Sequence, residues 1–255
     1  MQRFVHKGVG IAFIDVPPHQ GDGPVVLAIH GFASNHSVNW VGPQWVRSLT
    51  HAGYRVIAMD NRGHGQSDKL YDAAAYDTRL MADDAAGLLE HLDVRTAGVI
   101  GYSMGARIAA FLAVLRPDLV ASLALGGLGI HLIDGVGLPQ SIAAAMEAER
   151  LEDVADPMGR MFRAFAMSTK SDLKALAACI RGSRQVLTPR ETGQILAPTI
   201  ICVGTNDPIA GDPHALARHI PGAKAFDIEG RDHNLAVGDR THREAVIKHF
   251  NETLK

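Results

Sequence analysis

Short apolar runs that alternate with helix-forming segments constrain the fold of this chain most. They lie at Val25–Ile29, Arg55–Met59, Ala97–Tyr102, Val120–Leu125, Thr199–Val203 and Ala223–Ile228. Helix-forming segments separate the first four runs, near Pro43–Ala52, Thr78–Leu92 and Met104–Leu115. Continuous apolar runs are typical of parallel strands that are buried on both faces. Arg3–Lys7 and Gly10–Val16 are expected to form an antiparallel hairpin. The sequence therefore predicts an α/β fold with a mostly parallel central sheet covered by helices on both faces.

The alternation fails in the middle of the chain. Helix-like pieces without a convincing strand follow one another there, at Pro139–Glu152, Pro157–Met167 and Ser171–Ile180. We interpret residues 128–197 as a small helical cap that is inserted into the core domain. That core domain then consists of residues 1–127 and 198–255.

The expected cap carries large, flexible apolar side chains. They are Met146, Met158, Met161, Phe162, Phe165 and Met167. Any one of them can simply pack the cap onto the core domain, which is the more common role of an apolar residue on a helix. As a cluster they can line a pocket, because such side chains adapt to varied ligands. The candidates for a substrate pocket are Phe32, Met158, Met161, Phe162 and Phe165.

Composition and charge exclude several classes of function. A chain of 255 residues, 47% of them hydrophobic, fits one enzyme-sized domain with an insertion. The formal net charge is −2 and the Lys and Arg residues are scattered, so neither a nucleic-acid stripe nor a polybasic membrane signal is present. No apolar signal core or membrane-spanning run is found, and we expect a cytoplasmic protein with no nucleic-acid or membrane partner. Cys179 and Cys202 are too few for a disulfide framework and too far apart in sequence for a metal knuckle.

A serine lies between two glycines where a predicted strand ends and a predicted helix begins. The five residues are Gly101, Tyr102, Ser103, Met104 and Gly105. The backbone must turn so sharply there that side chains at both ends of the motif would collide with neighbouring elements, and glycine removes them. A serine on such a turn has its hydroxyl lifted above the sheet, as in a nucleophile elbow. The pattern is common in isolation, so Ser103 needs support from other residues.

A serine nucleophile needs a base, and the base needs an acid that orients it. Asp207 directly follows the strand Thr199–Val203, and His233 directly follows the strand Ala223–Ile228. Both therefore emerge at the carboxyl edge of the predicted sheet, where Ser103 also lies. This convergence predicts a catalytic triad of Ser103, Asp207 and His233.

Other acids and histidines fit these roles less well. Asp232 is adjacent to His233, and peptide geometry opposes its orienting that ring. Asp134 is the main rival acid, because it comes after the strand Val120–Leu125, but Asp207 fits the strand-end pattern better. His64 and His131 follow strands without an acid placed in the required order.

An oxyanion hole is predicted at the end of the first apolar strand. Val25–Ile29 ends in His30, Gly31 and Phe32, where glycine lets the chain turn. Two preorganised N–H donors stabilise a tetrahedral oxyanion, each typically by roughly 3 kcal/mol. We expect these donors to be the N–H groups of Phe32 and Met104. A plain turn is the alternative interpretation of residues 30–32, but the pairing of these residues with the elbow favours the oxyanion hole.

With these motifs in place, the whole chain resembles the α/β-hydrolase superfamily. The resemblance is carried by residues 30–32 (HGF), 60–68 (DNRGHGQSD) and 101–105 (GYSMG) and by the loops of Asp207 and His233. It implies the same triad and oxyanion hole, with no cofactor and no metal ion, and a structural role for the loop 60–68. Haloalkane dehalogenases and epoxide hydrolases of this superfamily carry an aspartate nucleophile, so Ser103 favours the serine branch.

Within the superfamily, the chain is most similar to small bacterial esterases, enol-lactonases and cofactor-free haloperoxidases (perhydrolases). Ser103-Met104 matches the last group, although many of its members have tryptophan in place of Phe32. Meta-cleavage C–C hydrolases are also similar, but they usually have asparagine where this chain has Tyr102. Ala106 replaces a glycine that is often found just after the elbow.

These features predict a serine hydrolase that cleaves an ester-type bond of a small molecule through an acyl-enzyme, as a carboxylesterase or lactonase does. A C–C hydrolase or perhydrolase with the same triad is one alternative. A small-molecule receptor or binding module with vestigial hydrolysis is an alternative of another class. The sequence leaves open whether the bond is an ester, lactone, thioester or carbon–carbon bond, how large the acyl pocket is, and the oligomeric state.

Overall fold

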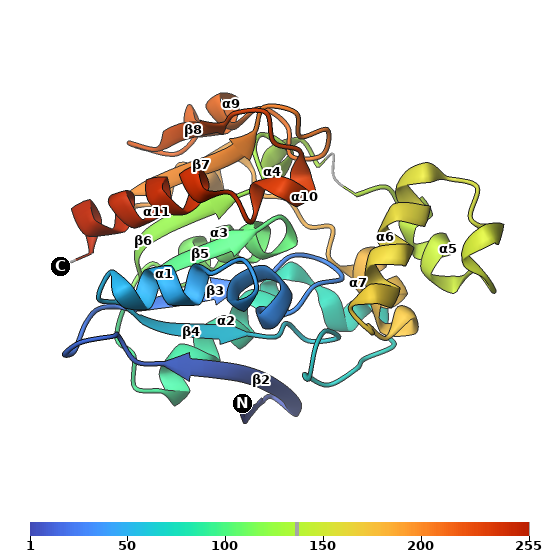
Figure 1. The fold of residues 1–255 in the computed structure, drawn as a ribbon, viewed down its shortest axis with the longest axis horizontal. Coiled ribbons are helices and arrows are strands. Elements are labelled where there is room, and N and C mark those ends of the chain that lie inside the picture. The colour runs from blue at the N-terminus through green and yellow to red at the C-terminus, as the bar shows by residue number, and fades with distance from the viewer. Residues whose placement is uncertain (136–137, 255) are drawn as a thin grey trace.

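A single twisted sheet forms the centre of the molecule (Figure 1). The computed structural model describes residues 1–135 and 138–254, and within them the sheet has eight strands. They are β1 (Gln2–His6), β2 (Val9–Val16), β3 (Val25–Ile29), β4 (Arg55–Met59), β5 (Ala97–Tyr102), β6 (Val120–Gly126), β7 (Thr199–Gly204) and β8 (Lys224–Ile228). Their spatial order is β1-β2-β4-β3-β5-β6-β7-β8, and β2 runs against both of its neighbours. The predicted α/β fold with a mostly parallel sheet is confirmed.

Helices cover both faces of the sheet. In chain order they are α1 (Trp45–His51), α2 (Thr78–His91), α3 (Met104–Leu115), α4 (His131–Asp134), α5 (Ser141–Glu147), α6 (Pro157–Ser168), α7 (Leu173–Gly182), α8 (Pro189–Thr192), α9 (Pro213–Ala217), α10 (His233–Ala236) and α11 (Arg240–Thr253). Short helical turns lie at Ser37–Val41, Ala73–Tyr76 and Leu151–Asp153. On the face of α1 and α11 the core contains Trp40, Trp45 and Phe250, and on the face of α2 and α3 it contains Leu88 and Phe111. These side chains are fully or almost fully buried. Removal of their apolar surface from water is the main term that stabilises the folded core.

The segment between β6 and β7 forms helices α4 to α8 and, in its described residues, no strand. Figure 1 shows α5, α6 and α7 beyond the carboxyl ends of the parallel strands. Two of these helices begin at aspartates that cap exposed N–H groups. Asp156 accepts from the N–H of Gly159 at the start of α6, and Asp172 accepts from the N–H of Ala175 at the start of α7.

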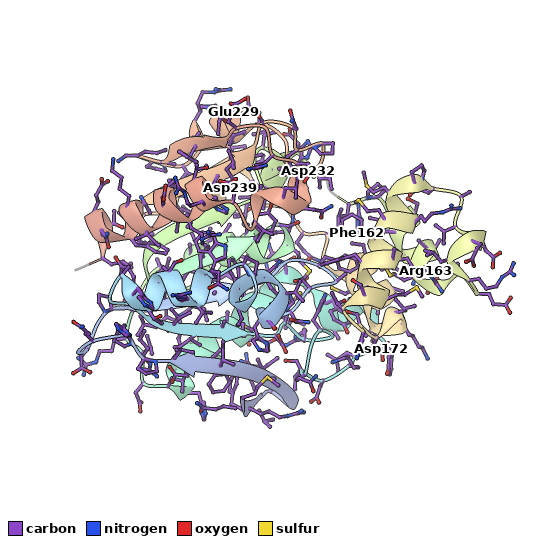
Figure 2. The ribbon with its side chains drawn as sticks, viewed as in Figure 1. Phe162, Arg163, Asp172, Glu229, Asp232 and Asp239 are labelled. Carbon is purple, nitrogen blue, oxygen red and sulfur yellow. The ribbon has the colours of Figure 1, made fainter. Side chains whose placement is uncertain are left out.

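Helices α5 and α6 are joined by a buried arginine. Arg163 on α6 donates to the carbonyl oxygens of Ala145 and Met146 on α5, at 2.6 and 3.0 Å. Figure 2 shows Phe162 on the side of α6 that faces the sheet and Arg163 on the side toward α5. One face of α6 is therefore turned toward the core domain.

The register of the sheet aligns the strand ends that carry the loops of interest. Gly101 on β5 lies opposite both Ile29 on β3 and Leu125 on β6, and Gly126 lies opposite Cys202 on β7. The loops after β3, β5, β6 and β7 therefore begin at one edge, where ligands bind in open parallel sheets. Separately, no helix within the described residues combines the length and apolar character needed to cross a membrane.

Candidate active site

Ser103 lies on a strained turn between β5 and α3. Its φ and ψ angles are 55° and −114°, a conformation that residues with side chains rarely adopt and that costs of order 1–3 kcal/mol. A Cβ at Gly101 would lie 2.2 Å from the carbonyl oxygen of Gly105, and one at Gly105 would lie 2.0 Å from that of Ile29. Both positions therefore require glycine. The turn ends β5 and begins α3, with Ser103 as the residue before the first turn of the helix.

The structure brings Ser103, His233 and Asp207 together from three separate loops. His233 Nε2 is 3.0 Å from Ser103 Oγ, and His233 Nδ1 is 2.7 Å from Asp207 Oδ2. A carboxylate only accepts hydrogen bonds, so Nδ1 carries the ring proton and Nε2 presents its lone pair to the serine hydroxyl. The side chain of Asp207 is fully buried and that of His233 is 7% exposed. In this arrangement, His233 can remove the hydroxyl proton of Ser103.

Asp207 is held in place by the backbone of its own loop. Its Oδ1 accepts from the N–H groups of Ile209 and Ala210, at 2.8 and 3.0 Å. Oδ2 is then left to face His233. The two rival acids lie elsewhere: Asp232 caps α10 by accepting from the N–H groups of Asn234 and Leu235, and Asp134 is exposed at the end of α4.

Tyr102, the residue before the nucleophile, positions the loop of the base. Its phenol donates to the main-chain carbonyl of His233 at 2.5 Å, and the two rings lie 5.5 Å apart. Burial, with a smaller effect from the nearby charge of Asp207, raises the pKa of Tyr102 well above its usual value. The phenol therefore stays neutral and keeps donating.

Two backbone N–H groups are available for an oxyanion site. Among the residues that the structure describes, neither the N–H of Phe32 nor that of Met104 donates to another group. Met104 begins α3, so its N–H lies at the positive end of the helix dipole. The loop of Phe32 is fixed by Asn39, whose Oδ1 accepts from the N–H of Gly31 at 2.8 Å. The arrangement can stabilise negative charge beside Ser103 Oγ.

His30 supports the same loop from beneath. The N–H of Asn61 donates to His30 Nε2 at 3.0 Å, so Nδ1 carries the proton and donates to the carbonyl of Gly31 at 2.7 Å. Burial lowers the pKa of His30 to about 4, although nearby Asp60 acts in the opposite direction. His30 is therefore a neutral structural link rather than a second base.

The loop 60–68 ties elements together. Burial alone would raise the pKa of Asp60, but hydrogen bonds from His36 and Gln66 and the nearby His30 lower it to about 2. Arg62 forms a buried two-bond ion pair with Asp84 on α2, at 2.6 and 2.7 Å. The side chains of this loop are thus engaged in contacts with neighbouring elements.

Two cavities flank Ser103. The large cleft has a volume of about 890 Å³ and is lined by Ser103, His233, Asn234 and the side chain of Phe162 from α6, among others. The small pocket has a volume of about 60 Å³ and is lined by Ser103, Met104, Arg107, Ile180 and Arg184, among others. Phe32 lines both. The nucleophile is therefore reached from two sides.

The predicted pocket residues divide between lining and packing. Phe32, Met161, Phe162 and Phe165 line the large cleft. Met158 was expected with them, but among the described residues it packs against the core cluster and lines neither cavity. Met158 lies one helical turn, or about 6 Å, nearer the start of α6 than Phe162. The end of α6 reaches the core, where Thr169 donates to the carbonyl of Ala33, so Met158 lies too far from the cleft.

Several residues near Ser103 were not singled out as site residues from the sequence. They are Asn39, Tyr102 in its contact with His233, Arg107 and Arg184. Arg107 offered one signal, because its position four residues after Ser103 places it one turn into α3. Asn39 lies in the short helical turn Ser37–Val41 and Arg184 in the segment after α7, and the sequence pattern does not indicate where either lies in space.

Comparisons with known proteins agree with this fold. A family model described as the alpha/beta hydrolase fold matches residues 24–140. Epoxide hydrolase B of Mycobacterium tuberculosis is 36% identical over 135 residues, which make up 51% of this chain and 35% of that protein. The match thus spans about a third of the length of that relative.

Solved structures resemble the chain over nearly its whole length. A hydrolase from Pseudomonas aeruginosa PA01 has a TM-score of 0.79 at 21% identity and covers 98% of this chain and 97% of its own. The enol-lactonase from Burkholderia xenovorans LB400 has a TM-score of 0.75 at 20% identity and covers 98% of this chain. At these identities the likeness concerns the fold. Taken with the family model and the sheet topology, it shows that this chain has the α/β-hydrolase fold.

Proposed function

We propose that this chain is a serine hydrolase that cleaves an ester-type bond of a small molecule through an acyl-enzyme intermediate. The observation that carries the proposal is the hydrogen-bonded series Ser103, His233 and Asp207, with distances of 3.0 and 2.7 Å. The hydroxyl, the imidazole lone pair and the buried carboxylate occur in the order that nucleophilic acyl transfer needs.

In the first step, Ser103 Oγ attacks the carbonyl carbon and His233 Nε2 takes the hydroxyl proton. The charge that develops on the carbonyl oxygen is stabilised by the N–H groups of Phe32 and Met104. When the tetrahedral intermediate collapses, His233 gives its proton to the leaving oxygen and the alcohol departs. Asp207 keeps the ring oriented and stabilises its charged form.

In the second step, water attacks the acyl carbon of the ester on Ser103. His233 removes a proton from this water and returns it to Ser103 Oγ as the acyl group leaves as a carboxylic acid. The net reaction consumes one water and yields one acid and one alcohol. A lactone follows the same course, with acid and alcohol in one product.

The nucleophile argues against transfer of the curated relative's activity. That relative is named an epoxide hydrolase. In the superfamily that the sequence resembles, epoxide hydrolases carry an aspartate nucleophile. This chain has Ser103, within hydrogen-bonding distance of a histidine. Acyl transfer is therefore the better supported reaction. C–C cleavage and perhydrolysis use the same triad and remain alternatives.

A small-molecule receptor is the alternative from another class, favoured by the large cleft of about 890 Å³. A fluorophosphonate probe and p-nitrophenyl acetate separate the two. The serine hydrolase is expected to be labelled on Ser103 and to release a burst of p-nitrophenol, and Ser103→Ala is expected to lose both. The matched control Ser168→Ala alters an exposed serine on α6. A folded protein that is not labelled and hydrolyses no ester would contradict the proposal.

A further inference from the structure

The small pocket combines two arginines with the nucleophile. Arg107 on α3 and Arg184 just after α7 both line it, together with Ser103 and Met104. Among the residues that the structure describes, no aspartate or glutamate lines this pocket. Its other walls are mostly apolar, as with Phe32 and Ile180. A positively charged recess thus adjoins the reacting oxygen.

Arg107 is buried without a carboxylate partner in the described part of the chain. Its Nη1 donates to the carbonyl of Gln185 at 2.9 Å and its Nη2 to that of His131 at 3.1 Å. Both acceptors are neutral. They engage two of the five N–H donors of the guanidinium, so three donors are not used by these two carbonyls. A buried charge without a counter-ion is costly. Such a group marks a place where a ligand can supply the missing charge.

The surroundings of Arg107 add to this cost. Its backbone N–H donates to the carbonyl of Ser103 at 3.1 Å, so it lies in the first turns of α3, where the helix dipole already favours anions. Burial and the charge of Arg184 lower the pKa of Arg107 to about 10. Below that value the side chain is protonated, so it is a cation at neutral pH.

The large cleft differs in its charge balance. There Arg231 pairs with Asp239 at 2.7 Å and Arg240 pairs with Glu244 at 3.4 Å. Figure 2 shows Asp239 at the start of α11, beside α10. Carboxylates of the protein thus offset two of the arginines in this cleft.

The two cavities differ in the catalytic groups that line them. His233, which must protonate the leaving oxygen, lines the large cleft and is not part of the lining of the small pocket among the described residues. Met104, one of the oxyanion donors, lines the small pocket. The leaving alcohol therefore belongs to the large cleft and the acyl chain to the small pocket.

The size of the small pocket limits the acyl chain. Each water-sized group needs about 10–15 Å³, so a pocket of about 60 Å³ holds about four to six such groups. A carboxylate on a short arm of one or two methylene groups has this size. We therefore expect short acyl chains to fit this pocket best.

We propose that the small pocket is an acyl subsite for a short chain ending in a carboxylate, which Arg107 and Arg184 bind, so that the preferred substrates are half-esters of small dicarboxylic acids with a larger alcohol. This inference rests on the acyl-enzyme chemistry proposed above. The acyl carbon exchanges its bond to the leaving oxygen for one to Ser103 Oγ, whose proton passes through His233 to the alcohol. Water then releases the diacid and restores Ser103.

Two matched pairs of esters test whether a negative charge on the substrate is preferred and whether it must lie on the acyl side of the ester. Monobenzyl succinate is compared with benzyl isohexanoate, whose isopropyl end has the shape of the carboxylate without its charge. The second pair carries the charge on the alcohol and has an acyl group that the small pocket can hold: acetyl glycolate is compared with isobutyl acetate. We expect kcat/KM to favour the charged member of the first pair by about tenfold or more, the size of a charge-assisted hydrogen bond, and to show no such preference in the second.

Arginine variants then locate the effect. Arg184→Gln and Arg107→Gln are expected to reduce the first ratio by about tenfold, and Arg107→Lys to keep part of it. The ratio compares two substrates on one preparation, so loss of active enzyme does not change it. Arg181→Gln is the matched control, because Arg181 is exposed on α7 and pairs with Glu147. If Arg107→Gln does not fold, the subsite is still tested by the wild-type ratios and by Arg184→Gln, since Arg184 is exposed.

Calorimetric binding to the Ser103→Ala variant separates this inference from the proposed function. Hydrolysis of both first-pair esters at similar kcat/KM would overturn the subsite and leave the hydrolase intact. A second outcome is that monobenzyl succinate binds more tightly than benzyl isohexanoate, that Arg184→Gln abolishes this difference, and that the parent protein hydrolyses no ester. This outcome would support the subsite and reject the hydrolase. Neither turnover nor preferential binding would reject both.

Discussion

The phenol of Tyr102 donates a hydrogen bond to the main-chain carbonyl of His233 at 2.5 Å, so the residue before the nucleophile holds the loop of the base. Tyr102→Phe removes this bond and keeps the ring. We expect kcat to fall by about tenfold with little change in KM, because small misplacements of a base are costly to the chemical step. Steady-state kinetics on an ester and the rate of fluorophosphonate labelling measure the effect.

Tyr54→Phe is the control for this variant, since its hydroxyl donates to Asn251 away from the site. Equal losses in the two variants would show that the bond to His233 has only a stabilising role.

Asp207→Asn is expected to reduce kcat by about 10⁴-fold with little change in Tm. The asparagine oxygen can keep the bonds from the N–H groups of Ile209 and Ala210, so the loop stays in place. The NH₂ group of the asparagine then faces His233 Nδ1 and forces the ring proton onto Nε2. A protonated Nε2 can no longer accept the hydrogen bond from Ser103. Asp212→Asn, at the start of α9, is the control. Activity close to that of wild type would exclude Asp207 as the orienting acid.

Stability is expected to fall as the pH is lowered from 6.5 toward 4. Burial lowers the pKa of His30 and His242 to about 4 and that of His64 to about 3. The unfolded chain, with histidine pKa values of about 6.5, therefore binds more protons than the folded chain in this range, and acid favours unfolding. Three such groups lower the free energy of unfolding by up to about 4 kcal/mol per pH unit.

Urea unfolding at several pH values measures this slope. We expect His242→Gln to reduce the slope by about one proton and the exposed His51→Gln to leave it unchanged. A free energy of unfolding that does not change between pH 6.5 and 4.5 would contradict the burial of these neutral rings.

Gly105→Ala is expected to destabilise the protein by about 3 kcal/mol or more, because its Cβ would meet the backbone carbonyls of Ile29 and His30. Backbone atoms cannot move aside as a flexible side chain can. At Gly238 a Cβ would be 3.6 Å from Pro43 Cβ, an ordinary contact, so Gly238→Ala is the control. Thermal unfolding of both variants makes the comparison, and similar Tm values would show that the elbow tolerates a side chain.

The sequence predicted the sheet well because its central strands are continuous apolar runs between helices. β3, β4 and β5 begin and end at the expected residues. The grouping of Ser103, Asp207 and His233 followed from topology, since each comes directly after a strand whose end lies at the same edge. No property of the three residues beyond their type and place in the chain was needed.

Other parts of the site depend on distances that a single sequence does not contain. Met158 and Phe162 lie on the same side of α6, and only the position of that helix over the core decides which of them reaches the cleft. Likewise, the sequence shows that Arg107 is charged but not that its described neighbours supply neutral carbonyls instead of a carboxylate. Tertiary packing sets both outcomes.

The left-handed backbone of Ser103 has a consequence for engineering. Glycine adopts a φ of 55° without strain, so Ser103→Gly would relieve the turn at the same moment as it removes the reactive hydroxyl. Selection for heat resistance alone would therefore favour an inert protein at this position. Thermostabilisation of this fold has to proceed elsewhere and be screened for turnover at every round.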